Sequence, residues 1–218
     1  MTDARTAILG RLRAAAGKDV PPAEDFTVVS PRGWTAEHRL ERLRRMMEAV
    51  HTEFLDCRGQ DWLGPLRDWL IQEGVPGLIY APATAIGRRL AAEWSGGVPL
   101  ISYDKAMAEW KEELFAQSAA GITGTRGGIA ETGSLILWTD ADQPRSLSLV
   151  PPLHIALLDV NSLYDTFWQA MREQKWAAGM PTNLLLISGP SKTADIEQTL
   201  AYGVHGPKRL LVILVDQC

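Results

Sequence analysis

The sequence predicts an α/β protein with a layered, largely parallel sheet flanked by helices, and with an N-terminal helical extension. From about residue 50 onward, short apolar runs alternate with segments of helical periodicity, which is typical of βαβ units. The apolar runs are uniformly apolar and do not alternate with polar residues, as expected for parallel strands covered by helices on both faces. At 218 residues the chain is long enough for one large domain of this kind.

The N-terminal part follows a different pattern. Apolar residues recur there at helical spacing and predict a helix over residues 2–16: Ala4, Ile8, Leu12 and Ala15. A stretch of proline and acidic residues over 20–25 breaks this helix and is typical of a linker. We therefore predict an N-terminal helix and linker over residues 1–33, and a single α/β domain over residues 34–218.

The elements of the predicted domain follow in order along the chain. Helices are predicted over residues 35–50, 61–72, 84–94, 161–174 and 193–200. Strands are predicted over residues 54–56, 77–80, 98–101, 134–138, 154–158, 184–187 and 210–215.

Composition excludes several classes of function. The net charge of −4, with Arg39, Arg42, Arg44 and Arg45 interleaved with glutamates, argues against a nucleic-acid-binding protein. Its two cysteines, Cys57 and Cys218, form no CxxC motif, so we expect no iron–sulfur cluster and no other cofactor in this chain. No apolar run approaches the roughly 20 residues of a membrane span, and a cytoplasmic location is expected.

The sharpest candidate for a binding site is the glycine turn at residues 189–195. An apolar run precedes it and a helix is predicted to begin at Thr193, where free backbone amides would hold an anion. Ser191, Thr193 and Lys192 add two hydroxyls and a charge, so we assign Gly189 and these three residues to ligand binding. Asp195 is also assigned to ligand binding: its charge would repel an anion, but it can bond to a ligand hydroxyl, or alternatively to a neighbouring loop. The alternative interpretation is a simple helix cap at Thr193.

Two further glycine turns carry candidate catalytic residues. In residues 128–134, Glu131 is a candidate general base or nucleophile, and Thr132 and Gly133 are assigned to ligand binding; alternatively, Glu131 only accepts backbone hydrogen bonds. In residues 203–207, His205 is a candidate for titration near neutral pH or for a structural role. The histidines show no metal-ligand spacing, so no metal site is expected.

These turns also resemble those of a known family. The matching segments are G-I-A-E-T-G-S-L-I-L, S-L-V-P-P-L-H-I-A, I-S-G-P-S-K-T-A-D-I-E and G-V-H-G-P-K-R-L, in this order. They resemble the LUD-domain family, of the lactate-utilization protein C type. The resemblance implies a fold akin to the NagB/RpiA/CoA-transferase-like superfamily. It also implies a role in L-lactate oxidation to pyruvate alongside partner proteins, at least one of which carries iron–sulfur clusters.

We therefore expect an accessory, non-redox component of a lactate-oxidising system that binds a small anionic ligand. The alternative is a stand-alone enzyme of the CoA-transferase or phosphosugar-isomerase type that uses Glu131. A third possibility is an interaction module in which the glycine turns only shape the backbone. Fold alone does not decide among these, because one fold hosts many functions.

Overall fold

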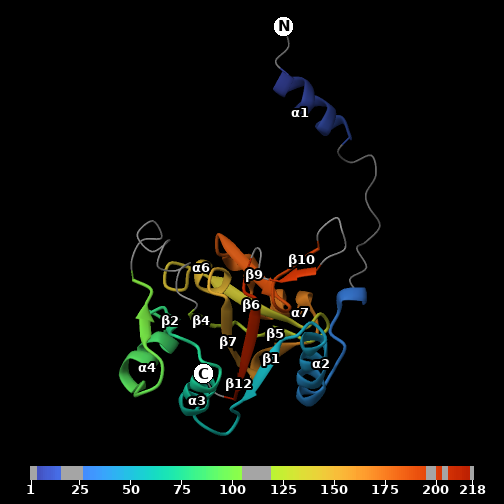
Figure 1. Ribbon diagram of the computed structural model, residues 1–218. Helices are drawn as coiled ribbons and strands as arrows, with labels where there is room; N and C mark the ends of the chain where they lie inside the picture. Colours follow the sequence, from blue (N-terminus) through green and yellow to red (C-terminus); the bar gives the residue numbers. More distant parts are fainter. Residues whose placement is uncertain (1–3, 16–26, 105–118, 195–199, 203–205, 217–218) are drawn as a thin grey trace. The chain divides into compact units, whose positions relative to one another are not determined.

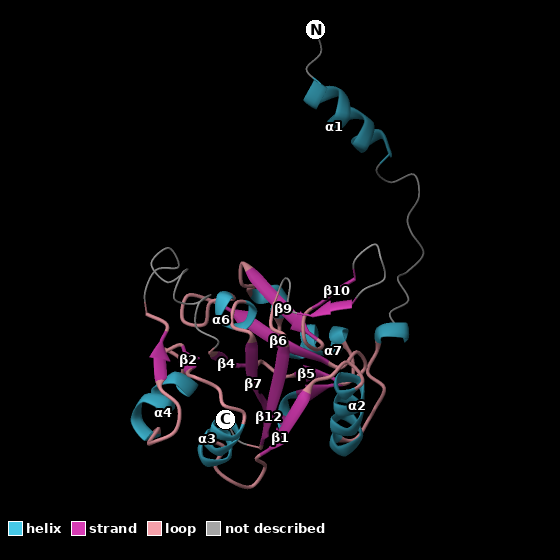
Figure 2. Ribbon diagram, viewed as in Figure 1, coloured by secondary structure: helices cyan, strands magenta, loops and turns pink. Residues whose placement is uncertain are grey.

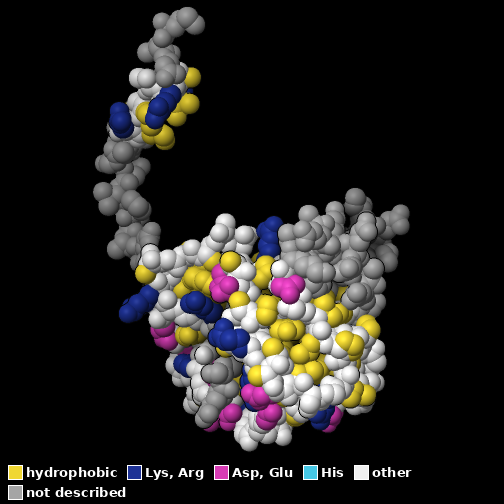
Figure 3. Space-filling model, turned by 90° about the vertical axis from the view of Figure 1, so that its left-hand side faces the viewer, with side chains coloured by type: hydrophobic (Ala, Val, Ile, Leu, Met, Phe, Trp, Pro, Cys, Tyr) yellow, Lys and Arg dark blue, Asp and Glu magenta, His cyan; other side chains and the backbone are white. Residues whose placement is uncertain are grey.

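The computed structural model describes residues 4–15, 27–104, 119–194, 200–202 and 206–216 (Figure 1). The chain divides into two compact units, Met1–Ser30 and Pro31–Cys218, which are described separately. The first contains helix α1 (Ala4–Ala15) and a 3-10 turn, η1 (Thr27–Val29). Helix α1 confirms the helix predicted over residues 2–16. Its apolar side chains are exposed, including Ile8 and Leu12, and Figure 3 shows hydrophobic and basic side chains on its surface.

The second unit is built on a six-stranded, fully parallel sheet, which confirms the predicted fold class (Figure 2). Its strands, in spatial order, are β1 (Glu53–Asp56), β12 (Arg209–Val215), β7 (Leu153–Asp159), β4 (Ala120–Gly124), β2 (Leu78–Tyr80) and β3 (Leu100–Ser102). Helix α3 (Leu63–Gln72) follows β1 in the chain, and α4 (Ala85–Glu93) joins β2 to β3.

A second, four-stranded sheet has the order β8 (Leu163–Tyr164), β5 (Gly128–Ile129), β6 (Ser134–Thr139), β9 (Asn183–Ile187). Strand β6 is antiparallel to both β5 and β9. The strands predicted at residues 134–138 and 184–187 are therefore present, but they belong to this sheet and not to the parallel one. For β6 the reason is local: only four residues separate it from β5, and such a short connection joins antiparallel strands. Strand β9 then pairs with β6.

Strand β12 shows how the two faces of the parallel sheet are covered. Its alternate residues Leu211 and Ile213 join a core cluster with the helices α3 and α4. The intervening Val212 and Leu214 join a cluster on the opposite face, with residues of β6 and of helix α2 (Ala36–Glu48). Both faces of β12 are therefore buried, and this is why its sequence is apolar at consecutive positions.

The helix predicted over residues 161–174 is only partly correct. The structure has a 3-10 turn, η2 (Val160–Ser162), then β8, and only then helix α7 (Phe167–Glu173). Thr166 caps α7 by accepting a hydrogen bond from the Gln169 amide, which fixes the late start of the helix. The preceding residues pair as a strand with β5, so the long-range contact outweighs the helical pattern.

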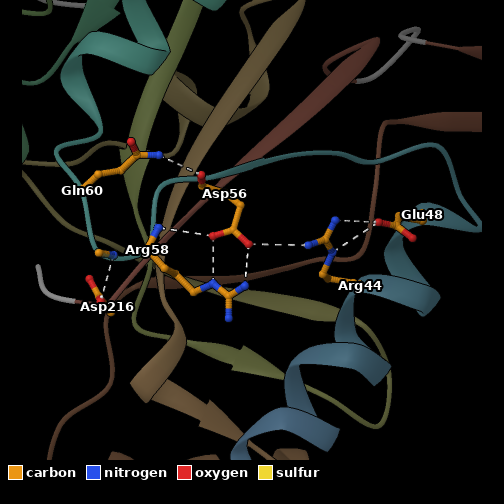
Figure 4. A network of polar contacts seen from close by, with 7 residues as sticks. Arg44, Glu48, Asp56, Arg58, Gln60 and Asp216 are labelled. Atoms are coloured by element: carbon orange, nitrogen blue, oxygen red, sulfur yellow. Dashed lines mark hydrogen bonds and ion pairs between the residues drawn. The ribbon is translucent and has the colours of Figure 1, made fainter.

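A network of hydrogen bonds and ion pairs lies at the carboxyl ends of β1 and β12 (Figure 4). Asp56 accepts two hydrogen bonds from the Arg58 guanidinium, at 2.8 and 2.6 Å, and Arg44 lies 3.9 Å from the same carboxylate. The hydrogen bonds with Arg58 hold the pKa of Asp56 below its ordinary value. Asp216 accepts the Gly59 amide at 3.0 Å. Both carboxylates are thus engaged within the protein.

Candidate functional site

A cavity of about 190 Å³ lies where the amino ends of β7 and β12 meet the carboxyl end of β9. We call it the His154 pocket. Its polar side is formed by Ser148, His154, Ser188, Gly189 and Ser191. Its remaining wall is formed by Leu149, Leu186, Ile187, Gly206, Pro207 and Leu210. The pocket is therefore bordered by the second and third of the glycine turns singled out in the sequence.

Close backbone contact holds these two turns together. The Ser191 amide donates a hydrogen bond to the Pro207 carbonyl at 2.8 Å. A Cβ atom added at Gly206 would lie 3.1 Å from the Ser191 Cβ, and one added at Gly189 would lie 2.7 Å from a methyl group of Val50. The two glycines thus allow the turns to approach each other and the chain after α2.

The first glycine turn reaches the same pocket through a chain of hydroxyl groups. The hydroxyls of Thr132 and Ser134 are 2.8 Å apart, and those of Ser134 and Ser188 are also 2.8 Å apart. Gly133, between them, has a φ of +63° and packs against Met46 of α2. The second and third turns therefore border the cavity, and the first turn is linked to it through Ser134 and Ser188.

The helix predicted to begin at Thr193 is wrong. Residues Lys192–Ala194 form strand β10, which pairs antiparallel with β11 (Leu200–Tyr202). The backbone of this segment is engaged in a strand pair, so the predicted anion site at a helix N-terminus does not exist there. The Lys192 side chain is exposed, and the pocket begins at Ser191. Asp195 and His205 lie outside the described residues.

Glu131 lies in a cluster of arginines. Its carboxylate forms an ion pair of 2.8 Å with Arg32, and its side chain is about one third exposed (34%). The backbone carbonyl accepts a hydrogen bond of 3.4 Å from Arg42, and the backbone amide donates to the Asp165 carbonyl at 3.0 Å. Glu131 is not among the residues that form the His154 pocket.

Asp165 anchors this cluster, and the sequence interpretation missed it. Its carboxylate is fully buried and accepts hydrogen bonds from Arg39 Nε at 2.5 Å, from the Gly33 amide at 2.7 Å and from the Trp34 amide at 3.4 Å. Burial raises the pKa of Asp165, but the hydrogen bonds and the charge of Arg39 outweigh this effect and leave the pKa below its ordinary value. Asp165 lies within the segment 161–174, which was predicted to be helical and was not considered as a site.

His154 is the other residue that the sequence interpretation missed. Its side chain is buried (1% exposed), and its Nε2 lies 2.8 Å from the hydroxyl of Thr123. Nδ1 has no hydrogen-bond partner among the described residues. Burial lowers the pKa of His154 to about 3, so the imidazole is uncharged at neutral pH. The available signal was a single polar residue inside an otherwise apolar strand.

A second cavity, of about 300 Å³, lies at the carboxyl ends of β4 and β7, beside the start of α4. Here β2 leads to β3 on one side and β4 leads to β7 on the other, which is the topological switch where open α/β sheets bind ligands. However, its polar side chains are engaged with the protein. Gln143 bonds to the Gly124 amide and carbonyl, and Arg89 pairs with Asp61 and Glu93. In the His154 pocket the Ser191 hydroxyl has no hydrogen-bond partner among the described residues, and this pocket is the better candidate.

In the part of the chain that the structure describes, no three His, Cys, Asp or Glu side chains are grouped so that they could hold a metal ion. Within the same residues, no helix has the length and apolar character needed to cross a membrane.

Known proteins resemble this chain along most of its length. A protein of unassigned function from Neisseria meningitidis serogroup B is 37% identical over 97% of this chain and 93% of its own length. Lactate utilization protein C of Bacillus subtilis is 30% identical over 95% of this chain and 91% of its own length. The crystal structure of a DUF162 family protein from Deinococcus radiodurans shares the fold, with a TM-score of 0.60 and 22% identity, over 84% of this chain and 99% of that one.

The sequence pattern of the LUD domain matches residues 40–215, which include the parallel sheet, the second sheet and all the described residues of the His154 pocket. Two relatives named lactate utilization protein C each align with 95% of this chain. The chain belongs to the LUD-domain family.

Proposed function

We propose that this protein is an accessory, non-redox component of a lactate-utilization system, and that it binds a small anionic ligand in the His154 pocket. The observation that carries the proposal is a cavity that two of the glycine turns border and that hydroxyl hydrogen bonds link to the third. The relation to lactate utilization rests on the Bacillus subtilis relative, which aligns over 95% of this chain and bears that name.

The state of Cys57 supports a non-redox role for this chain. Its thiol is fully buried, and burial, followed by the negative charges of Asp56 and Asp61, raises its pKa to about 11. A thiol in this state is a poor ligand for an iron–sulfur cluster, which requires thiolates. We propose that electron-carrying iron–sulfur clusters belong to partner proteins of the system.

The proposal is tested first by ligand binding to the purified full-length chain. Lactate, pyruvate, inorganic phosphate, a sugar phosphate and a CoA ester are compared by thermal denaturation. A ligand at a hundred times its dissociation constant adds about 2.7 kcal/mol to the free energy of unfolding, which corresponds to a rise in Tm of roughly 5–10 °C for a domain of this size. We expect Ser191→Ala, which removes the hydroxyl at the pocket, to reduce the rise. Ser95→Ala, at an exposed serine, is the matched control.

The cellular part of the proposal requires a genetic test. Deletion of the gene should impair growth on lactate as sole carbon source, and the wild-type gene should restore it. The protein should also co-purify with iron–sulfur proteins under mild conditions. Normal growth of the deletion strain together with absence of co-purification would rule out the accessory role.

The alternative enzyme of the CoA-transferase or phosphosugar-isomerase type gains no support from the position of Glu131, which is paired with Arg32 away from the pocket. Turnover of a CoA ester that disappears in Glu131→Gln would restore that alternative. Turnover that persists in this variant would remove Glu131 from the mechanism.

A further inference from the structure

We infer that the cavity of about 300 Å³ at the carboxyl ends of β4 and β7 is a second binding site, and that it takes a small, uncharged ligand with an apolar ring system. We call it the switch cavity. Its lining includes Trp62, Ile86, Arg89, Gly124, Gln143 and Leu157. This inference goes beyond the proposed function, because it concerns a different cavity and a different class of ligand.

The wall of the switch cavity is built on the core of the protein. It comes from the residue before α3, the first turns of α4, the ends of β4 and β7 and the loop before α6, all of which are described residues. Trp62 and Leu157 are buried and belong to the core cluster on this face of the sheet, and Ile86 packs against that cluster. The large apolar side chains of the wall are therefore held in place, and the cavity is preformed.

A glycine at the end of β4 keeps the cavity open. A Cβ atom added at Gly124 would lie 3.1 Å from Cδ1 of Ile86 and 3.6 Å from Oε1 of Gln143, and both of these side chains line the cavity. Gly124 is not among the glycines with a positive φ, so its backbone conformation does not require glycine. What the glycine provides is the space between two side chains of the wall.

The hydrogen-bonding groups around the cavity already have partners within the protein. The side-chain amide of Gln143 accepts the Gly124 amide at 2.8 Å and donates to the Gly124 carbonyl at 3.1 Å. The Thr125 hydroxyl donates to the Leu157 carbonyl at 2.9 Å, and the Thr84 hydroxyl accepts a backbone amide of α4 at 3.0 Å. A ligand therefore gains little from hydrogen bonds here, and burial of its apolar surface supplies most of the affinity.

The charges at the cavity favour an uncharged ligand. Arg89 is the one charged side chain among the described lining residues, and it pairs with Asp61 at 2.6 Å and with Glu93 at 3.3 Å. An anionic ligand would have to compete with these two carboxylates for the guanidinium group, and it would lose hydration at an apolar wall. A cationic ligand would find no carboxylate among the described residues of the lining.

The size of the cavity restricts the ligand to one or two rings. Its volume of about 300 Å³ is about twice that of an apolar cavity of about 150 Å³, which is large enough to bind benzene. Ala85, which also lines the cavity, is exposed, so a ligand can enter from solvent. A bicyclic aromatic molecule such as indole is therefore a suitable probe.

Methyl NMR on the full-length chain tests the inference. Isoleucine methyl groups are labelled, and indole is titrated in parallel with indole-3-carboxylate, which has the same rings and a negative charge. We expect a saturable shift of the Ile86 Cδ1 signal with indole, and binding of the carboxylate that is weaker by about tenfold or more. Ile86→Val identifies the signal by its disappearance. Ile71 is exposed and does not line the cavity, so its signal controls for adsorption to the surface.

A single added methyl group tests where indole binds. Gly124→Ala places a methyl group between Ile86 and Gln143 and should raise the dissociation constant of indole by about tenfold or more, the effect of one methylene group in an apolar pocket. The matched control is Gly64→Ala on α3, where an added Cβ meets no atom within 4 Å, and this variant should bind as the wild type does. Equal affinity of Gly124→Ala and the wild type would overturn the assignment to this cavity.

The titration of the wild type is decisive even if Gly124→Ala does not fold. Absence of a saturable shift up to the solubility limit of indole, or equal shifts of the Ile86 and Ile71 signals, would overturn the site. Tighter binding of indole-3-carboxylate than of indole would overturn the uncharged ligand class. Binding of lactate or pyruvate at the His154 pocket is a separate result, so the failure of either proposal is distinguishable from the failure of the other.

Discussion

Replacement of Arg39 by methionine is expected to lower the free energy of unfolding by about 3–5 kcal/mol at pH 7, because it leaves the buried carboxylate of Asp165 without its counter-charge. Asp165 is fully buried, and Arg39 is its ion-pair partner, with 2.5 Å between Nε and Oδ1. The amides of Gly33 and Trp34 remain as hydrogen-bond donors, but they carry no formal charge. Methionine preserves much of the apolar length of the arginine side chain, so the loss reports mainly on charge.

The pH dependence of this loss distinguishes a buried charge from lost packing. In the wild type the pKa of Asp165 is lowered, so its stabilisation is present above the unfolded pKa of about 3.9 and is lost as the pH falls below that value. In Arg39→Met, burial dominates and should raise the pKa of Asp165 above 3.9. Protonation then relieves the penalty, and the difference between variant and wild type should shrink as the pH falls from 7 toward 4.

Urea denaturation of both proteins at several pH values measures this difference. The matched control is Arg44→Met, on the same helix, because Arg44 pairs with the exposed carboxylate of Glu48 and with Asp56. Such a surface pair contributes about 0–1 kcal/mol, so the control should change little. A loss in Arg39→Met that is the same at every pH would show that packing, and not the buried charge, is the main contribution of Arg39.

The Asp165 cluster also explains why its residues were difficult to foresee. Its partners Gly33, Trp34 and Arg39 are more than 120 residues away in the chain. Local periodicity carries no information about such contacts. In the sequence, Arg39 is one of a group of arginines balanced by glutamates. Such a group is typical of a solvated helix face. Only the fold shows that one of these arginines neutralises a buried acid.

Strand prediction succeeded where burial controls the sequence. Strand β12 is apolar at consecutive positions because both of its faces are covered, and the same holds for most of β7. Prediction failed at both described ends of the segment 193–200, where local helix signals were opposed by an antiparallel pairing of β10 with β11. Strand pairing depends on a partner segment, and helix-capping signals do not reveal whether such a partner exists.

The candidate site, too, could be predicted from the sequence only in part. The glycine turns were visible because glycine marks turns and close backbone approaches. Ser191 and Gly189 do form part of the His154 pocket, and Thr132 is linked to it. His154 itself comes from the parallel sheet, and its contact with Thr123 depends on the pairing of β4 with β7. That information is absent from the sequence. The binding roles assigned to all seven of these residues stay predictions: Thr132, Gly133, Gly189, Ser191, Lys192, Thr193 and Asp195.

Replacement of Gly133 by alanine is expected to lower the free energy of unfolding by about 3 kcal/mol, which is the second large effect. The backbone φ of Gly133 is +63°, a conformation that costs a residue with a Cβ roughly 1–2 kcal/mol. The added Cβ would also lie 2.4 Å from the Cβ of Met46. Because that atom is attached directly to the α2 backbone, the helix itself must move, and overpacking of this kind costs about 1–3 kcal/mol.

Two comparisons separate the strain from the steric clash. Gly59 has a similar φ of +72° with open space around it, so Gly59→Ala should cost only about 1–2 kcal/mol. Met46→Gly removes the clashing Cβ, at a cost of about 1 kcal/mol in helix propensity. In the double variant the two losses should therefore not add, and the coupling should be at least about 1 kcal/mol.

This double-mutant cycle also decides what Gly133 contributes to the pocket. If Gly133→Ala unfolds more easily and the double variant regains both stability and ligand affinity, the glycine acts by fitting the first turn against α2, which in turn positions the hydroxyls of Thr132 and Ser134. If Gly133→Ala keeps its stability but loses the ligand, the turn itself contacts the ligand and the packing explanation is wrong. Urea denaturation and ligand titration of the same four proteins distinguish these outcomes. Only in the second outcome does ligand affinity fall while stability stays unchanged.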